Sequence, residues 1–211
     1  MADKFRNKNT SVCMDYLPMT WEMNILTTER LLLKPIETGH AEAIFRYRSD
    51  SFTNRYQGWI PDDVEDAVSF ITNRTFHEIN VNGTWFQLVV TLRATGEIIG
   101  DIGMHFLGSK NEQVELGCTI AREHQGKGYA KEALTEVISY LFGRLEKRRL
   151  IAFIDPANIP SIKVFERLGF IREDHSRESR PPDESRVDDL VYSLYKSGLN
   201  SSITLAETRK G

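Results

Sequence analysis

The chain has 211 residues, of which 27% are charged and 40% hydrophobic, with a formal net charge of -3. This length suffices for a domain with a full core, and the weak negative charge gives no electrostatic case for nucleic-acid binding. The sequence shows no apolar run long enough to cross a membrane and no signal-like apolar segment, so we expect no membrane association and a cytoplasmic location. Two cysteines, Cys13 and Cys118, do not make a disulfide framework.

Three segments are expected along the chain. Residues 1–24 are polar without periodicity and are predicted to form a flexible leader. An arm that packs on a second copy in a homodimer, and a native start at Met23, remain open alternatives. Residues 25–198 are expected to form a single domain, and residues 199–211 a C-terminal tail.

The first half of the domain predicts a strand, two helices and a hairpin. Pro61 opens the second helix together with two acidic residues, and Asn82 with Gly83 marks a turn. The loop 51–60 between the helices is aromatic and holds one cation, Arg55. The predicted ranges are 29–36 for the strand, 38–49 and 61–79 for the helices, and 85–92 and 97–106 for the hairpin.

The centre of the chain predicts a strand, a glycine-rich turn and a long helix. The strand covers residues 113–120, and Gly126 and Gly128 stand just before the helix. Glycines at a helix N-terminus let backbone N–H groups approach an anion such as phosphate, although a tight turn without a ligand is the plainer alternative. Apolar residues recur at helical spacing at Ala130, Ala133, Leu134, Val137, Ile138, Leu141 and Phe142.

Two common phosphate-loop patterns do not fit this turn. The P-loop pattern ends in Gly-Lys-Ser/Thr, whereas Lys127 is followed by Gly128. The dinucleotide pattern needs a third glycine where this chain has Lys131. The turn is therefore a phosphate loop of another kind.

The last part of the domain predicts a strand, a short helix and a final strand pair. Asn158 begins the helix and Gly169 is placed as its C-terminal cap. The whole pattern predicts a mixed α/β (α+β) fold with a central sheet of about six or seven strands and about four helices. The ranges are 150–155 for the strand, 170–174 and 187–196 for the pair, and 176–186 for the polar loop joining the pair.

At these motifs the chain resembles the GNAT superfamily of acyl-CoA-dependent N-acetyltransferases. Residues 125–130 match the family's pyrophosphate loop, Gln/Arg-x-x-Gly-x-Gly/Ala, letter for letter. The residues at 28–33 and 189–194 are similar to the subgroup that includes the ribosomal-protein-alanine N-acetyltransferases, and the resemblance covers about residues 27–198. The family's second signature is matched by Asn158, Ser161, Gly169 and Phe170.

The resemblance implies acetyl-CoA as co-substrate and names the residues that hold it. Backbone N–H groups of the loop would cradle the pyrophosphate, three residues at the end of the preceding strand would line the pantetheine, and Asn158 would contact the pantetheine or cap its helix. Cys118 is also expected to be a small core residue. The implied cofactor-binding set is Cys118, Thr119, Ile120, Gln125, Gly126, Lys127, Gly128, Tyr129, Ala130, Asn158 and Ser161.

Two residues are the candidates for catalysis. Glu115 lies in the middle of an apolar strand, where a carboxylate is costly unless it faces a cleft, and is the candidate base. Ser161 is the candidate acid or thiol-positioning group. Many family members have a tyrosine acid at the position of Phe165, so either Ser161 replaces it or no acid is needed. An exposed strand carboxylate and a first-turn helix hydroxyl are the ordinary alternatives.

The acceptor is expected to be a primary amine that attacks the thioester directly. At pH 7 about 0.04% of an ordinary lysine amine is neutral, against roughly one-sixth of an α-amine, so a lysine-like acceptor needs a base more. A protein N-terminal α-amine is the first expectation. A small amine such as an antibiotic or polyamine, a non-catalytic acyl-CoA sensor and a nucleotide-binding protein are the alternatives.

No metal site is expected from the sequence. His105, His124 and His175 show no spacing with cysteine or acidic residues that fits a closed metal site. The acceptor itself would be selected by the loops 51–60 and 176–186.

Overall fold

The computed structural model describes residues 25–173 and 189–197. The predicted leader and tail, and the loop 176–186, lie outside these residues. An eight-stranded mixed sheet runs in the order β1-β2-β3-β4-β5-β6-β8-β7. Its strands are β1 (Leu26–Thr27), β2 (Leu31–Pro35), β3 (Trp85–Leu92), β4 (Ile98–Leu107), β5 (Gln113–Ile120), β6 (Arg149–Ile154), β7 (Ile171–Arg172) and β8 (Leu190–Tyr195).

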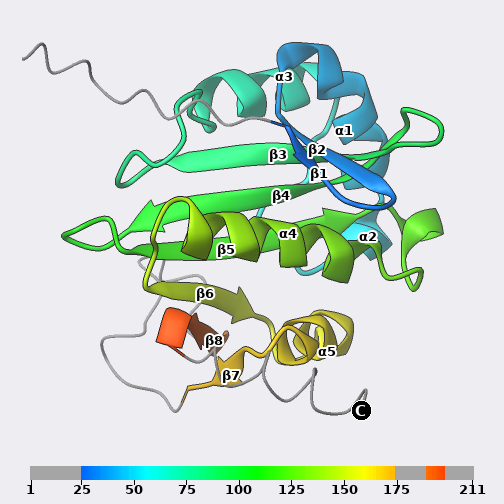
Figure 1. Cartoon of the computed structure of the whole chain (residues 1–211). Helices are drawn as coiled ribbons and strands as arrows, with labels where there is room; N and C mark the ends of the chain where they lie inside the picture. The colour runs from blue at the N-terminus through cyan, green and yellow to red at the C-terminus, as the bar shows by residue number, and fades with distance from the viewer. Residues whose placement is uncertain (1–24, 174–188, 198–211) are drawn as a thin grey trace, which may run out of the picture.

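Helices cover both faces of this sheet. Figure 1 shows α4 crossing in front of β4 and β5, with α5 lower on the same side, whereas α1 and α3 pack against each other over the other face. The helices are α1 (Ala41–Arg48), α2 (Ser51–Asn54), α3 (Val64–Asn73), α4 (Tyr129–Gly143) and α5 (Ile159–Arg167), with 3-10 turns η1 (Thr38–His40) and η2 (Arg122–His124).

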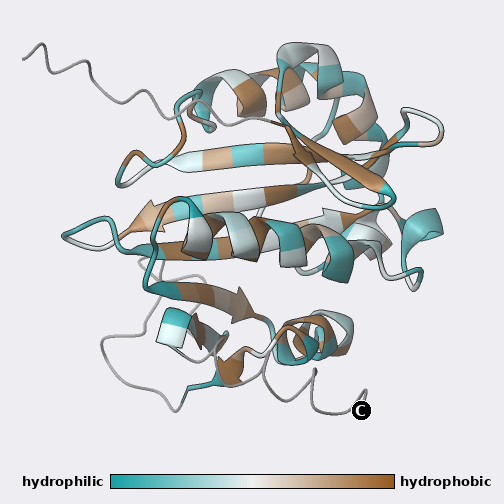
Figure 2. Cartoon of the chain, viewed as in Figure 1, coloured by the Kyte–Doolittle hydropathy of each residue, from teal (hydrophilic) through white to brown (hydrophobic). Residues whose placement is uncertain are grey.

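The main core lies between the sheet and the helices α4 and α5. Alternate side chains of each strand enter it, and the apolar stripe predicted for α4 is buried there. Figure 2 shows the strands mostly in brown and the loops at their ends mostly in teal. A smaller cluster on the opposite face joins α1 and α3 to Val89 and Ala121. That second face is therefore covered by helices over only part of its width.

The parallel strands β5 and β6 pair over a short distance. Their register runs from Gln113 opposite Arg149 to Glu115 opposite Ile151, although β5 continues to Ile120 and β6 to Ile154. Each strand is followed at its carboxyl end by a helix, α4 after β5 and α5 after β6. Ligands of open α/β sheets bind outside the carboxyl ends of strands, so the position of the site follows from this splay.

The predicted fold class is confirmed. The structure also has two short elements, one strand and one helix, that the sequence did not predict. The two-residue β1 and the four-residue α2 are too short to give a periodic signal. Asp50 caps α2 by accepting a hydrogen bond from the Thr53 backbone N–H at 2.7 Å. In the described residues, no helix has the length and apolarity needed to cross a bilayer.

The helix predicted for residues 61–79 is shorter in the structure. It begins after Asp63, whose side chain accepts from the Asp66 N–H, and ends at Asn73. The backbone N–H of Phe76 instead donates to the carbonyl of Trp85, which ties the following segment to β3. The apolar spacing continues past the helix because Ile79 is buried in the main core.

Candidate active site

The glycine-rich turn forms an open N-terminus for α4. Gly126 and Gly128 have positive φ angles of 74° and 83°, a conformation that side chains with a Cβ adopt rarely. Gly128 is the N-cap residue of α4. Because glycine has no side chain, it provides no acceptor to cap the helix. The backbone N–H groups of the first turn are consequently left for another acceptor, which fits the predicted phosphate site.

Arg30 holds this turn from the neighbouring strand pair, a role that the sequence did not suggest. Its guanidinium donates to the carbonyl of Lys127 at 3.1 Å, forms an ion pair with Glu132 at 2.6 Å and lies 4.4 Å from the ring centre of Tyr129. Thr28 donates a second hydrogen bond to Glu132, at 2.5 Å. The Thr-Glu-Arg segment matched the family pattern, but its spacing from the loop gave no sign of this contact.

The other predicted loop residues have different surroundings. The Gln125 amide donates to the carbonyl of Ile120 at 2.8 Å and so anchors the loop to the end of β5. Lys127 is exposed, with its carbonyl held by Arg30. Tyr129 and Ala130 are half-buried and pack against the main core. Their backbone N–H groups, rather than these side chains, are the groups that can reach a phosphate.

The three strand residues predicted to line the pantetheine lie where β5 leaves β6. Cys118 and Ile120 point toward the main core, and Thr119 points to the other face, opposite Asp101 of β4. Removal from water, with a smaller effect of Asp101, raises the pKa of the Cys118 thiol to about 12. A neutral thiol is a poor nucleophile, which argues against an acyl-enzyme on Cys118.

The N-terminus of α5 presents the second family signature. Asn158 is its N-cap, and the side-chain oxygen accepts from the Ser161 backbone N–H at 3.3 Å. Within the part of the chain that the structure describes, the Ser161 hydroxyl makes no hydrogen bond to protein. Tyr56, from the loop after α2, donates to the carbonyl of Ala157 at 3.0 Å and bridges the two sides of the splay.

Phe165 lies in the core rather than in the site. Its side chain is 4% exposed and meets Phe170 edge to face at a centroid distance of 5.0 Å. The ring therefore contributes packing at the position where many family members carry a tyrosine acid.

Glu115 occupies the last paired position before β5 and β6 diverge. It is buried, at 3% exposure, on the face of β5 opposite the main core. His105 is its register partner on β4, with Nδ1 3.4 Å from a Glu115 carboxylate oxygen. The His105 ring stacks on Trp85 at 4.6 Å, which fixes its orientation. The carboxylate is thus placed by a rigid neighbour and is not an exposed strand charge.

Open space lies next to Glu115 along the same strand. Gly117 follows it on the same face, and a Cβ built there would meet no atom of the described residues within 4 Å. On the other side, Arg149 bonds Gln113 at 3.3 Å and Ser193 at 3.1 Å and pairs with Glu173 at 2.5 Å. Among the described residues, the position beside the carboxylate is therefore unfilled at Gly117 and flanked by a polar cluster.

A buried polar network lies under α1 on the same face of the sheet. Arg48 donates twice to Asp101, at 3.0 and 2.6 Å, while Tyr47 and Gln87 donate to it at 2.5 and 2.8 Å. Burial, followed by the charge of Asp101, raises the pKa of Tyr47 well above its ordinary value. Sequence reasoning missed this network because its members come from three distant segments.

The structure thus gathers the predicted residues into two groups around one splay. The glycine turn and the N-terminus of α5 follow the carboxyl ends of β5 and β6, and Glu115 lies on the far face of the sheet. A hollow of about 320 Å³ lies beside the glycine turn, along α4, rather than over Glu115. It is lined by Thr28, Gly128, Lys131, Glu132, Thr135 and Glu136.

A glycine turn and a second helix N-terminus around splayed parallel strands define an acyl-CoA-dependent acetyltransferase. The model of the acetyltransferase (GNAT) domain matches residues 30–171, and the chain belongs to this family of N-acetyltransferases. It is 31% identical over 175 residues to "Uncharacterized N-acetyltransferase p20" of Bacillus licheniformis, covering 82% of this chain and 97% of that protein. It is 34% identical over 173 residues to YoaA of Bacillus subtilis (strain 168), an N-acetyltransferase, with 82% and 97% covered.

Solved structures show the same fold. An acetyltransferase of the GNAT family from Bacillus anthracis has a TM-score of 0.69 at 26% identity, covering 82% of this chain and 99% of that one. A structure from Vibrio cholerae, named "putative ribosomal-protein-serine acetyltransferase", has a TM-score of 0.66 at 27% identity, covering 82% and 97%. The family uses acetyl-CoA as its acetyl donor.

Relatives differ in the acceptors that their names give. "Putative ribosomal N-acetyltransferase YdaF" of Bacillus subtilis (strain 168) is 35% identical over 101 residues, covering 48% of this chain and 55% of that protein. A spermidine N(1)-acetyltransferase of Vibrio cholerae is 23% identical over 146 residues, covering 69% and 82%. The family is therefore shared by proteins named for a protein acceptor and for a polyamine.

Proposed function

We propose that this N-acetyltransferase transfers the acetyl group of acetyl-CoA to the N-terminal α-amine of a protein, with Glu115 as the base. The observation that carries the proposal is the position of Glu115, buried at the last β5–β6 pair beside the open space at Gly117. A carboxylate so placed can reach an amine that enters from the face opposite the main core.

The reaction is a direct attack of the amine on the thioester carbonyl. The C–N bond forms as the C–S bond breaks, and the amine proton passes to Glu115, directly or through one water. His105 acts as a positioning residue because its Nδ1 meets the carboxylate and its ring is held by Trp85. No covalent enzyme intermediate is needed, which agrees with the raised pKa of Cys118.

Ser161 is the residue best placed to stabilise the departing thiolate. Its hydroxyl is half-buried at the N-terminus of α5 and makes no hydrogen bond to the described residues. It can donate to the sulfur, while the helix N-terminus favours negative charge there. A thiol pKa of about 8.5 makes the thiolate a fair leaving group, so this hydrogen bond would assist the step without being indispensable.

The donor would lie across the splay between the two helix N-termini. The N–H groups of the first turn of α4, after Gly126 and Gly128, would hold the pyrophosphate, with Lys127 adding charge nearby. The backbone of residues 118–120 would run along the pantetheine. The amide nitrogen of Asn158, which donates to none of the described residues, would contact it while the oxygen caps α5.

Two arginines near the carboxyl end of β5 favour a peptide over a polyamine as the acceptor. Phe52 of α2 is 51% exposed, with the guanidinium carbons of Arg55 and Arg122 at 4.2 and 4.4 Å from its ring centre. The η2 turn begins with Arg122, two residues after the end of β5, so these cations lie near the carboxyl end of that strand. These two positive charges disfavour a polycation such as spermidine and attract the carbonyl and acidic groups of a peptide, although Asp50, close to Arg122, offsets part of the charge.

The test is thiol release from acetyl-CoA with N-terminal peptides and with spermidine, in the wild-type chain and in Glu115→Gln. We expect peptides to be the better acceptors and kcat to fall about 10²- to 10⁴-fold in Glu115→Gln, with little change in acetyl-CoA affinity. Glu78→Gln, an exchange at an exposed residue between α3 and β3 that does not line the hollow, is the matched control.

Each other outcome has a defined meaning. Preference for spermidine would replace the acceptor by a small polyamine and leave the base assignment intact. Unchanged kcat in Glu115→Gln, with peptides still acetylated, would overturn the base assignment. Tight acetyl-CoA binding without thiol release to any amine would replace the enzyme proposal by an acyl-CoA sensor.

A further inference from the structure

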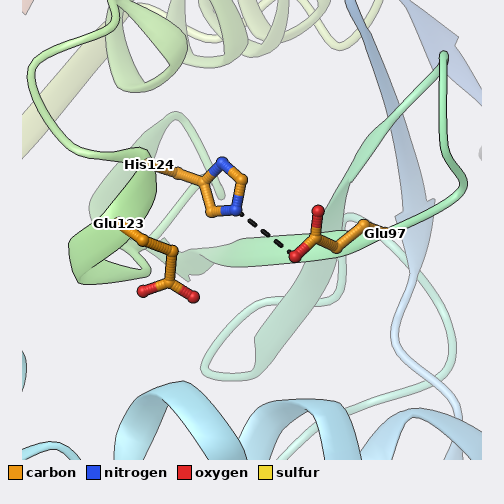
Figure 3. Close-up of side chains that lie close together, drawn as sticks. All are labelled: Glu97, Glu123 and His124. Carbon is orange, nitrogen blue, oxygen red and sulfur yellow. Dashed lines mark hydrogen bonds and ion pairs between the residues drawn. The ribbon is translucent and has the colours of Figure 1, made fainter.

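Three potential metal ligands meet next to the glycine turn. Glu97 precedes β4, and Glu123 and His124 belong to the η2 turn that follows β5. One ligand atom from each residue lies within 4.8 Å of the other two. Figure 3 shows the imidazole of His124 facing the carboxylate of Glu97, with Glu123 extending beside them.

We propose that Glu97, Glu123 and His124, none of which is assigned a role in acetyl transfer, form a binding site for a divalent ion of the zinc class beside the glycine turn. One imidazole nitrogen and two carboxylates are ligands that Zn²⁺ accepts, and three protein ligands leave a fourth position for water. The two negative charges balance those of the ion. Mg²⁺ and Ca²⁺ would bind less well because they prefer sites made of oxygen alone.

The distance between His124 and Glu97 fits two ligands of one ion better than a direct hydrogen bond between them. His124 Nε2 lies 3.4 Å from a Glu97 oxygen, which is long for an N–H···O bond, where about 2.9–3.0 Å is usual. In a tetrahedral site with ligands about 2.1 Å from the ion, neighbouring ligand atoms lie roughly 3.4 Å apart. Glu123 is exposed, and one of its carboxylate oxygens lies within 4.8 Å of the other two ligand atoms.

The backbone beneath the site is fixed on both sides. The N–H of Ala121 donates to the carbonyl of Ile99 at 2.8 Å, so the starts of η2 and β4 are joined directly below the ligands. Gln125 follows His124 and bonds back to Ile120. An ion here would therefore tie the β3–β4 turn to the segment that leads into the glycine turn.

The site should hold its ion weakly and exchangeably. Structural zinc sites usually have a hydrogen bond from the second imidazole nitrogen to an acceptor, which orients the ring. In the described part of the chain, Nδ1 of His124 is buried without such a partner. The two carboxylates are also exposed to solvent, so we expect rapid exchange and sensitivity to chelators.

Calorimetric titration of the chelator-treated full chain with Zn²⁺ tests the proposal. We expect one equivalent to bind, with a binding constant reduced at least about tenfold in His124→Ala and in Glu97→Gln. The Zn²⁺ complex should also melt at a higher temperature in the wild-type chain than in either variant. His77→Ala, at an exposed histidine outside the cluster, is the matched control and should bind as the wild type does.

Equal Zn²⁺ binding by the wild-type chain and His124→Ala, or no binding at all, would overturn the proposal. Displacement of Zn²⁺ by an equal concentration of Mg²⁺ would also overturn it, because an oxygen-preferring ion would then be the better ligand. None of these readouts depends on acetyl transfer, so failure of this site and failure of the proposed function remain distinguishable.

Discussion

Two cations are buried on opposite faces of the sheet, and their surroundings differ. Arg48 is the last residue of α1, on the face that carries Glu115, and is 6% exposed. Lys147 precedes β6 on the face of the main core and is 2% exposed. The first has a carboxylate partner, Asp101, whereas the structure gives the second a carbonyl and an aromatic ring.

The two pKa values move in opposite directions for this reason. Burial alone would lower the pKa of Arg48, but Asp101 more than reverses this and raises it above its ordinary value. Burial lowers the pKa of Lys147 from 10.5 to about 8, and no ion pair with a described carboxylate offsets it. The face that borders the site thus satisfies its charges, while the packing face tolerates one that is poorly satisfied.

The largest expected effect comes from breaking the satisfied pair. Asp101→Asn leaves Arg48 charged and buried without a carboxylate partner. It also replaces one of the two acceptor oxygens, Oδ2 of the Tyr47 bond or Oδ1 of the Gln87 bond, by an NH2 group that donates. Loss of one partner of a buried pair costs about 3–5 kcal/mol, so we expect the free energy of unfolding to fall by that amount. Urea denaturation followed by circular dichroism measures it.

The control for this experiment is a pair on the surface. Glu132→Gln weakens the contact with Arg30, which is 42% exposed, and an exposed pair contributes about 1 kcal/mol or less. Equal losses in Asp101→Asn and Glu132→Gln would show that the network under α1 is no better desolvated than the surface, and would remove the contrast between the two faces.

Much of the fold follows from local sequence patterns. The hairpin, the strand before the glycine turn and the stripe of α4 were predictable because each repeats a period of two or 3.6 residues over several turns. Positive φ at Gly126, Gly128 and Gly169 agrees with the turn and cap roles assigned to these glycines. The short β1 and α2 carry no such repeat and appear only in the structure.

The site was predictable only where it is contiguous in sequence. The glycine turn and the Asn158 segment are local motifs, so they could be recognised and aligned with a family. The contacts of Arg30 with the turn and of His105 with Glu115 depend on strand order and register, which the chain does not encode in any short window. The same holds for Glu97 and His124, which are distant in sequence and meet through the pairing of β4 with β5.

A smaller effect is expected from the backbone at the N-terminus of α4, the helix that covers the main core. Gly128→Ala forces a Cβ onto a residue with a φ of 83°, although among the described residues the added atom would meet Arg30 alone, at 3.5 Å. The left-handed conformation alone costs about 1–2 kcal/mol, so we expect that loss of stability and weaker binding of acetyl-CoA. Thermal unfolding and calorimetric titration measure the two effects.

Gly143→Ala, at the other end of α4, is the matched control. Gly143 has no positive φ, and a Cβ there would meet nothing within 4 Å. Alanine should therefore stabilise the helix by about 0.5–1 kcal/mol. If Gly128→Ala were as harmless as Gly143→Ala, the turn would not need its left-handed residue, and its preparation for a phosphate would lose its main support.

The smallest effect tests the poorly satisfied cation directly. Lys147→Met keeps an unbranched chain of similar size beside Phe106 and removes the ammonium, at the loss of its hydrogen bond to Asn111. Replacing a poorly paired buried charge by an apolar group is often stabilising, and we expect a gain of about 1 kcal/mol at pH 7. Thermal unfolding at constant ionic strength checks this value.

The pH dependence of stability tests the same residue, and the direction of the expected change follows from the lowered pKa of Lys147. Between about pH 8 and 10.5 the unfolded chain holds the Lys147 proton more tightly than the folded chain, so this residue makes stability rise with pH across that window. Below pH 8 both states are protonated and the destabilisation is fully present. The wild-type chain should therefore approach the stability of Lys147→Met as the pH rises from 8 to 10.5.

Comparing the variant with the wild type removes the contribution of other groups, because tyrosines with raised pKa values titrate in both chains. Lys163→Met, at an exposed position of α5, should leave the slope unchanged. A loss of stability in Lys147→Met at pH 7, with the slope of the wild type, would mean that the ammonium is satisfied by Asn111 and the ring of Phe106. The two faces would then stabilise their buried cations equally well by different means, one with a carboxylate and the other without.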